Sequence, residues 1–93
     1  MMIQSFKCRD TQALYEGNRV RRFSGIYAQA ELRLERLDNA TCLEDLNQFR
    51  GHRIELLKGK RKGQYSIRIN DQWRICFKWT DNGPTAVEIV DYH

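Results

Sequence analysis

The stretch QYSIRINDQWRICFKW, residues 64–79, decides the fold of this chain. Apolar and polar side chains alternate on both sides of a polar break at Asn70 and Asp71. Alternation with a period of two is typical of strands that bury one face, and Asn and Asp favour turns. The stretch therefore predicts a β-hairpin, and its buried face carries Tyr65, Ile67, Ile69, Trp73, Ile75, Phe77 and Trp79.

The opposite face of this hairpin is basic rather than mixed in charge. Helices that cover the apolar face would leave this second face open as a cationic surface, so we expect its cations to be accessible. The residues on it are Ser66, Arg68, Arg74, Cys76 and Lys78.

The rest of the chain supplies helices and further strands. Asp10 and Thr11 as capping residues, Gly17 as a stop, an apolar stripe at helical spacing and a T-x-x-E capping box at residues 41–44 predict two or three helices. Helices grouped on one face of an antiparallel sheet make an α+β domain, and 93 residues make one domain, residues 1–93. In chain order we expect a strand at 3–7 and then helices at 11–16 and at 25–37, the latter capped by Ser24, with a further short helix that begins at Thr41. A strand at 52–57, the hairpin, a turn at 80–84 and a last strand at 85–91 follow.

Charge is unevenly distributed along the chain. The net charge is +4, but residues 50–78 hold nine cations and two anions while the remainder is net −3. A basic half with embedded aromatic residues indicates a polyanionic partner, most simply nucleic acid. The alternative is a basic surface that is only solvated.

Several classes of protein are disfavoured. No apolar run is long enough to span a bilayer, and residues 1–6 lack the features of a signal peptide, so we expect a cytoplasmic protein without a membrane partner. The three cysteines are an odd, widely spaced set, which indicates small core residues rather than a disulfide framework or a zinc site. The sequence contains no phosphate-binding glycine loop, HExxH motif or nucleophile elbow, and we expect neither a metal nor an organic cofactor.

The cations and the chain end, Asp91-Tyr92-His93, suit the cleavage of RNA. That reaction needs help in removing the proton of a 2′-OH, an acid for the leaving 5′-oxygen, and cations for the charged phosphorane. His93 can serve as an acid or a base near neutral pH, Tyr92 can stack on a base or donate a proton, and Arg74 offers a bidentate fork to phosphate. Asp91 would orient a neighbour or act as a base. The plainer interpretation keeps a solvated terminus and an arginine paired with Asp71 or Glu88.

The sequence resembles the HigB toxins of the RelE/ParE superfamily, also called plasmid maintenance system killer proteins. The resemblance rests on LKG at residues 57–59, GQYSIRINDQWRICF at 63–77 and VEIVDYH at 87–93, and it spans essentially the whole chain. It implies a small antiparallel sheet flanked by helices. It also implies an mRNA interferase that enters the ribosomal A site, is neutralised by a HigA-type helix-turn-helix antitoxin, and meets operator DNA only through the antitoxin complex.

The resemblance also implies a set of site residues. Asp91, Tyr92 and His93 match the catalytic terminus of the family, and Arg74 matches its phosphate-contacting arginine. Some members carry a catalytic histidine where this chain has Glu55, so either Glu55 takes a base role or His93 works with fewer helpers. We expect mRNA or ribosome contacts from Lys58, Lys60, Arg61, Lys62, Arg68 and Lys78.

Two other functions remain open from the sequence. A toxin resembling ParE would inhibit DNA gyrase without cleaving nucleic acid, although the terminal Tyr92-His93 argues against it. A non-enzymatic RNA- or protein-binding module would keep its activity when truncated before Asp91.

Overall fold

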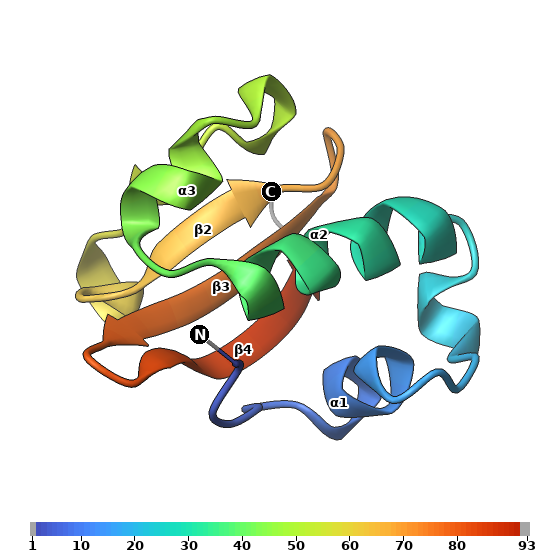
Figure 1. Cartoon of the computed structure of the whole chain (residues 1–93). Coiled ribbons are helices and arrows are strands. Elements are labelled where there is room, and N and C mark those ends of the chain that lie inside the picture. Colours follow the sequence, from blue (N-terminus) through green and yellow to red (C-terminus); the bar gives the residue numbers. More distant parts are fainter. Residues whose placement is uncertain (1, 92–93) are drawn as a thin grey trace.

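The computed structural model describes residues 2–91 of the chain. Three α-helices precede a sheet of four antiparallel strands, so the α+β prediction is confirmed (Figure 1). No described helix is long and apolar enough to cross a membrane. The elements are α1 (Arg9–Tyr15), α2 (Tyr27–Asn39), α3 (Leu43–Asn47), β1 (Glu55–Leu56), β2 (Tyr65–Arg68), β3 (Trp73–Thr80) and β4 (Gly83–Asp91).

The strands follow one another across the sheet in the order β1-β2-β3-β4. The predicted hairpin is confirmed, with Ile67 opposite Ile75 in the register of β2 and β3. Its turn is held by the Asn70 side chain, whose Oδ1 accepts the backbone N–H groups of Gln72 and Trp73, each at 2.8 Å. The second turn, expected at residues 80–84, consists only of residues 81 and 82, because Thr80 already pairs with Gly83.

The three helices cover one face of the sheet, and the core lies between the two layers (Figure 1). The α2 stripe of Ala30, Leu34 and Leu37 is buried, as its helical spacing predicts. The sheet contributes the apolar hairpin face and two β4 residues, and α1 lies beside both α2 and β4. The residues that the sheet and its hairpin contribute to this core cluster are Ile67, Ile69, Ile75, Phe77, Val87 and Ile89.

The N-terminal segment lies along the outer edge of β4. The expected strand at 3–7 is reduced to one parallel bridge between Phe6 and Val87. The amide of Lys7 donates to the Val87 carbonyl at 3.0 Å, and the Val87 amide donates to the Ser5 carbonyl at 3.1 Å. Here β4 bulges against β3, and Ala86 takes a positive φ of 53°.

The predicted helix ends are wrong by about two residues, because the expected capping side chains have other partners. The first helix begins at Arg9, since the buried Thr11 hydroxyl accepts the Ile89 amide at 2.9 Å instead of capping the helix. The second begins at Tyr27 rather than after Ser24, because residues 21–23 form a separate 3₁₀ turn. The Thr41 hydroxyl donates to Asp45 at 2.7 Å, so the expected capping-box partner, Glu44, is also wrong.

The strand expected at 52–57 is mostly absent. Only Glu55–Leu56 pairs with β2, because residues 50–52 form a 3₁₀ turn and Arg53 adopts a left-handed conformation with φ 43°. A left-handed residue breaks the extended chain, so the edge strand is confined to two residues.

Candidate active site

The cationic face of the sheet is built from two cross-strand rows on the side away from the helices. Residues that pair across an antiparallel sheet share a face, so the register places each row directly. The first row, from β1 to β4, is Glu55, Ser66, Cys76 and Glu88, and the second, from β2 to β4, is Arg68, Arg74 and Val90.

Arg74 is the most constrained cation of this face. Its Nε donates to the Ser66 hydroxyl at 2.9 Å, and its Nη2 donates to the Arg53 carbonyl at 3.0 Å. The same Nη2 lies 3.5 Å from a carboxylate oxygen of Glu55, and the Arg74 side chain is 14% exposed. The guanidinium is therefore held in place by three neighbours from two segments of the chain, with Glu55 as the ion-pair partner instead of Asp71 or Glu88.

The Arg53 carbonyl reaches Arg74 because the chain turns sharply just before β1. The buried His52 anchors this turn: its Nδ1 bonds the Leu46 carbonyl at 3.1 Å, and its Nε2 lies 3.3 Å from a nitrogen of Arg36. The carbonyl can only accept and the guanidinium can only donate, so the ring is neutral with its proton on Nδ1. Burial, and then the charges of Arg33 and Arg36, lower the pKa of His52 to about 4.

Two arginines stand directly opposite each other on this face. Arg68 and Arg74 are cross-strand partners, an arrangement that like charges disfavour. Each has a more exposed carboxylate beside it: Arg68 pairs with Asp71, which is 99% exposed, and Arg74 pairs with Glu55, which is 51% exposed. A phosphate arriving from solvent would meet both cations, and the exposed carboxylates could be displaced at little cost because they remain hydrated after leaving the arginines.

The prediction of a fully open basic face is wrong at its centre. Ser66 and Cys76 are buried, and Cys76 packs with Leu57 and Val90 in a small second apolar cluster. Short backbone bonds fold residues 57–64 over this part of the sheet, with the Leu57 amide donating to the Gln64 carbonyl at 2.8 Å. Burial raises the pKa of the Cys76 thiol, as expected for a core cysteine.

The predicted RNA-contacting residues divide into two kinds. Arg61 is committed to an ion pair of 3.2 Å with Glu88 and a hydrogen bond of 3.2 Å to Gln64, while Arg68 is half-buried beside Asp71. Both arginines are thus part of the sheet's own packing. The exposed cations of the set are Lys58, Lys60, Lys62 and Lys78.

The structure brings the end of β4, up to Asp91, beside Arg74. Arg74 pairs with Val90, and Trp73 pairs with Asp91, so residues 74 and 91 are one position apart in the register. The Asp91 carboxylate accepts from Gln72 Nε2 at 3.1 Å and is exposed. Strand alternation puts it on the opposite face from Arg74, so the two side chains are neighbours at one end of the sheet but not on one surface. The predictions for Tyr92 and His93 lie outside the described residues.

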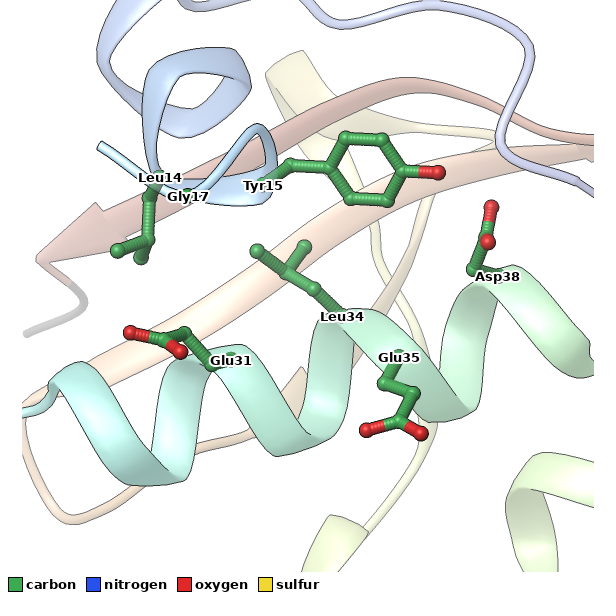
Figure 2. Close-up of a pocket in the computed structure, with 7 residues that line it drawn as sticks. All are labelled: Leu14, Tyr15, Gly17, Glu31, Leu34, Glu35 and Asp38. Atoms are coloured by element: carbon green, nitrogen blue, oxygen red, sulfur yellow. The ribbon is translucent and has the colours of Figure 1, made fainter.

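A separate hollow lies between α1 and α2. Figure 2 shows this groove of about 340 Å³, with Leu14 and Leu34 facing each other across it and acidic side chains along α2. Burial and the adjacent Asp38 raise the pKa of Tyr15 at its rim. None of the predicted site residues lines this groove. Within residues 2–91, no three His, Cys, Asp or Glu side chains gather in a way that could hold a metal ion.

Sequence reasoning missed the residues that hold Arg74. Ser66 occupies a polar position in an alternating strand, which predicts its face but not its burial or its partner. A signal that could have found it is the hairpin register, in which Ser66 pairs with Cys76 and lies two pairs from Arg74 on the same face. No local signal marks the Arg53 carbonyl, because its direction depends on a backbone angle.

Comparisons with known proteins agree with this architecture. Residues 4–93 match the family described as the RelE-like toxin of the type II toxin–antitoxin system HigB. The chain is 33% identical over 96 residues to Endoribonuclease HigB of Proteus vulgaris, covering 99% of this chain and 100% of that protein. It is 38% identical over 82 residues to Toxin HigB-1 of Vibrio cholerae, covering 86% of each.

A solved structure shows the same fold at low identity. The YoeB-YefM complex from Staphylococcus aureus contains a chain that superposes with a TM-score of 0.58 and 18% identity. The match covers 100% of this chain and 99% of that one, so the two chains share a fold over their whole length.

Proposed function

Because this chain belongs to the RelE-like HigB toxins of type II toxin–antitoxin systems, we propose that it is a ribosome-dependent endoribonuclease that cuts translated mRNA. The relative named Endoribonuclease HigB, aligned over nearly the full length, supports the activity. The observation that carries the proposal is the β3–β4 register, which sets the constrained Arg74 one position from the start of the Asp91-Tyr92-His93 terminus.

In the proposed reaction, the 2′-oxygen of a nucleotide attacks the adjacent phosphorus and loses its proton to a base. The bond from phosphorus to the 5′-oxygen breaks, and that oxygen takes a proton from an acid. Arg74 binds the non-bridging oxygens, on which negative charge grows in the phosphorane. His93 is our candidate for proton transfer, with Tyr92 stacking on a base or donating a proton.

Asp91 and Glu55 have different proposed roles. Asp91 is on the other face from Arg74 and accepts from Gln72, which favours orientation of the terminus over direct proton abstraction. Glu55 lies 3.5 Å from Arg74 on the solvent side, where it can act as a base once a phosphate displaces it from the guanidinium.

The ribosome would hold the mRNA in the geometry that cleavage requires. Few catalytic groups are present, so the geometry of the substrate must be fixed from outside, and free RNA should be cut poorly. Lys58, Lys60, Lys62 and Lys78 are exposed and suited to sequence-independent backbone contacts, with Arg61 and Arg68 beside them. We further propose a cytoplasmic location and a HigA-type helix-turn-helix antitoxin as the partner, with operator DNA contacted only through that complex.

Variants of the two central residues test this function. We expect Arg74→Ala and His93→Ala each to reduce cleavage of translated mRNA by roughly 100-fold or more, because each removes a group acting on the transition state. Primer extension in a reconstituted translation reaction, together with growth after induction, measures the effect. Arg19→Ala is the matched control, since it removes an exposed cation paired with Glu31 on the helical side.

The same assay distinguishes the alternatives. If both Arg74→Ala and His93→Ala arrest growth as the unaltered protein does, the proposed mechanism is wrong. Loss of gyrase supercoiling activity without mRNA cleavage would identify a ParE-like inhibitor. Equal cleavage by Glu55→Ala, Glu55→His and the unaltered protein would remove Glu55 from the mechanism.

A further inference from the structure

Ser66 carries a hydroxyl that has no contact with solvent. The residue is 0% exposed, in β2, with Glu55 and Cys76 as its cross-strand neighbours. Its oxygen accepts the Nε–H of Arg74 at 2.9 Å. A buried polar group is stabilised only when it is hydrogen-bonded, so Ser66 and Arg74 depend on each other.

The position of this contact on the guanidinium is important. An arginine side chain has several rotatable bonds, and a single terminal contact leaves the plane of its head group free to turn. Here Nε is fixed by Ser66 and Nη2 by the Arg53 carbonyl at 3.0 Å. Two contacts at separate nitrogens define the plane of the guanidinium, and therefore the direction in which it can form a fork with a phosphate.

We infer that Ser66 is a positioning residue for cleavage, holding Arg74 in the orientation that binds the substrate phosphate; this rests on the proposed function. Ser66 has no contact with the RNA in this role. It acts through Arg74, from a central strand that is more rigid than the loops around it. Glu55, by contrast, is half-exposed and can leave, so the hydroxyl keeps the orientation after the carboxylate has moved.

A plain packing role for Ser66 must be separated from this one. Cys76 provides the matched control, because it is the cross-strand partner of Ser66, is also 0% exposed, and lies in the same row of the same face. Removing its sulfur atom creates a larger cavity than removing the serine oxygen but leaves both Arg74 contacts in place. Damage from packing alone would therefore affect Cys76→Ala at least as much as Ser66→Ala.

A double-mutant cycle measures the coupling of Ser66 to Arg74. The second background is Arg74→Lys, which keeps a cation but has no Nε–H group to reach Ser66. Cleavage of translated mRNA is measured at saturating ribosome concentration, and ribosome affinity is measured separately. With Arg74 intact, we expect Ser66→Ala to reduce the maximal cleavage rate about tenfold and to leave ribosome affinity unchanged. In the R74K background, the same substitution should change the rate by less than about twofold.

The outcomes separate the inference from the proposed function. If Arg74→Lys and Arg74→Ala leave cleavage unchanged, Arg74 is not the phosphate ligand and the proposed function fails at its central residue. If those variants lose activity but Ser66→Ala lowers the rate equally in both backgrounds, or no more than Cys76→Ala does, the positioning role is wrong and the function stands. A Ser66→Ala effect confined to the Arg74 background supports the inference.

Discussion

His52 is a histidine that the fold keeps neutral. Both ring nitrogens are used inside the protein, on the Leu46 carbonyl and on Arg36, and burial with two nearby arginines disfavours a third positive charge. In the sequence it lies three residues before Glu55, the position at which the family resemblance led us to expect a catalytic group. Its contacts instead make it the anchor of the turn that presents the Arg53 carbonyl.

The lowered pKa of His52 predicts acid sensitivity. The folded pKa of about 4 lies below the usual value of 6.5, so the unfolded chain binds more protons between these values and stability falls as pH decreases through this window. From pH 7 to pH 5, we expect this group to reduce the free energy of unfolding by about 2 kcal/mol. Urea titrations at the two pH values measure the change.

His52→Gln is the control for this prediction. Glutamine can still offer a donor and an acceptor but does not titrate, so the drop between pH 7 and pH 5 should shrink by most of its size. An equal drop in both proteins would show that His52 does not cause the acid sensitivity.

At the scale of single residues, the sequence indicated chemistry better than it indicated contacts. Arg74 was identified from its residue type and its place in the hairpin, and the register confirms its face. Its partners, Ser66, Glu55 and the Arg53 carbonyl, were not predicted as a set. They come from two segments of the chain, and their meeting depends on a left-handed backbone at Arg53 that no propensity of arginine suggests.

At the scale of elements, α1 is fastened to the sheet by a hydroxyl rather than by apolar packing alone. Thr11 is completely buried in the first turn of α1, and its Oγ1 accepts the backbone N–H of Ile89 in β4. That amide lies on the outer edge of β4, where no further strand is available to pair with it. The sequence suggested Thr11 as a helix cap, because capping is the commonest use of a threonine at such a position.

Thr11→Val tests this fastening. Valine has nearly the same shape but leaves the Ile89 amide buried without a partner, so we expect a loss of about 2 kcal/mol in the free energy of unfolding. Thr11→Ser keeps the hydroxyl and removes only a methyl group, and its cost should be about 1 kcal/mol. Chemical denaturation of both variants gives the comparison. A serine variant less stable than the valine variant would show that Thr11 acts through packing and not through its hydrogen bond.

The ends of the elements were harder to predict than their existence. Periodicity identified the hairpin and the α2 stripe because each buried face repeats the same apolar pattern over many residues, so that one atypical residue does not hide it. The start of α2 depends on whether Ser24 or Ile26 begins the helix, a small local difference that the 3₁₀ turn at 21–23 decides. The cover over Cys76 could not be anticipated because it depends on how the loop at 57–64 folds back.

At the scale of the whole molecule, four of the five lysines gather on the sheet side, although exposed arginines such as Arg19 also lie on the helical side. Lys58, Lys60, Lys62 and Lys78 are exposed on the strand face and its loop, whereas the groove between α1 and α2 is lined by Glu31, Glu35 and Asp38. A protein with this distribution is drawn to a polyanion in one orientation. The sequence already shows this asymmetry as a basic run between residues 50 and 78, and the fold groups the lysines of that run on the sheet side of the molecule.

The charge separation predicts how ribosome binding responds to salt. Each lysine that contacts a backbone phosphate releases counterions, so affinity should fall as salt is raised. Replacing Lys58, Lys60 and Lys62 together by alanine should make the slope of log affinity against log salt less steep by about 2. Binding is measured in the His93→Ala background, which prevents cleavage during the titration. Arg19→Ala should leave the slope unchanged, and an unaltered slope in the triple variant would exclude those lysines from the contact.

The edges of the sheet are short or covered, and this affects how readily the protein can aggregate. One edge is a strand of only two residues, and the other is occupied by residues 4–7 and by Thr11. Exposed strand edges are where chains join into ordered aggregates, and a sheet without a long free edge offers no template for that growth. A sheet closed at both edges in this way gives the free protein no strand on which a second copy can add. The short N-terminal segment, which covers the outer edge of β4, therefore protects the protein against aggregation through its sheet.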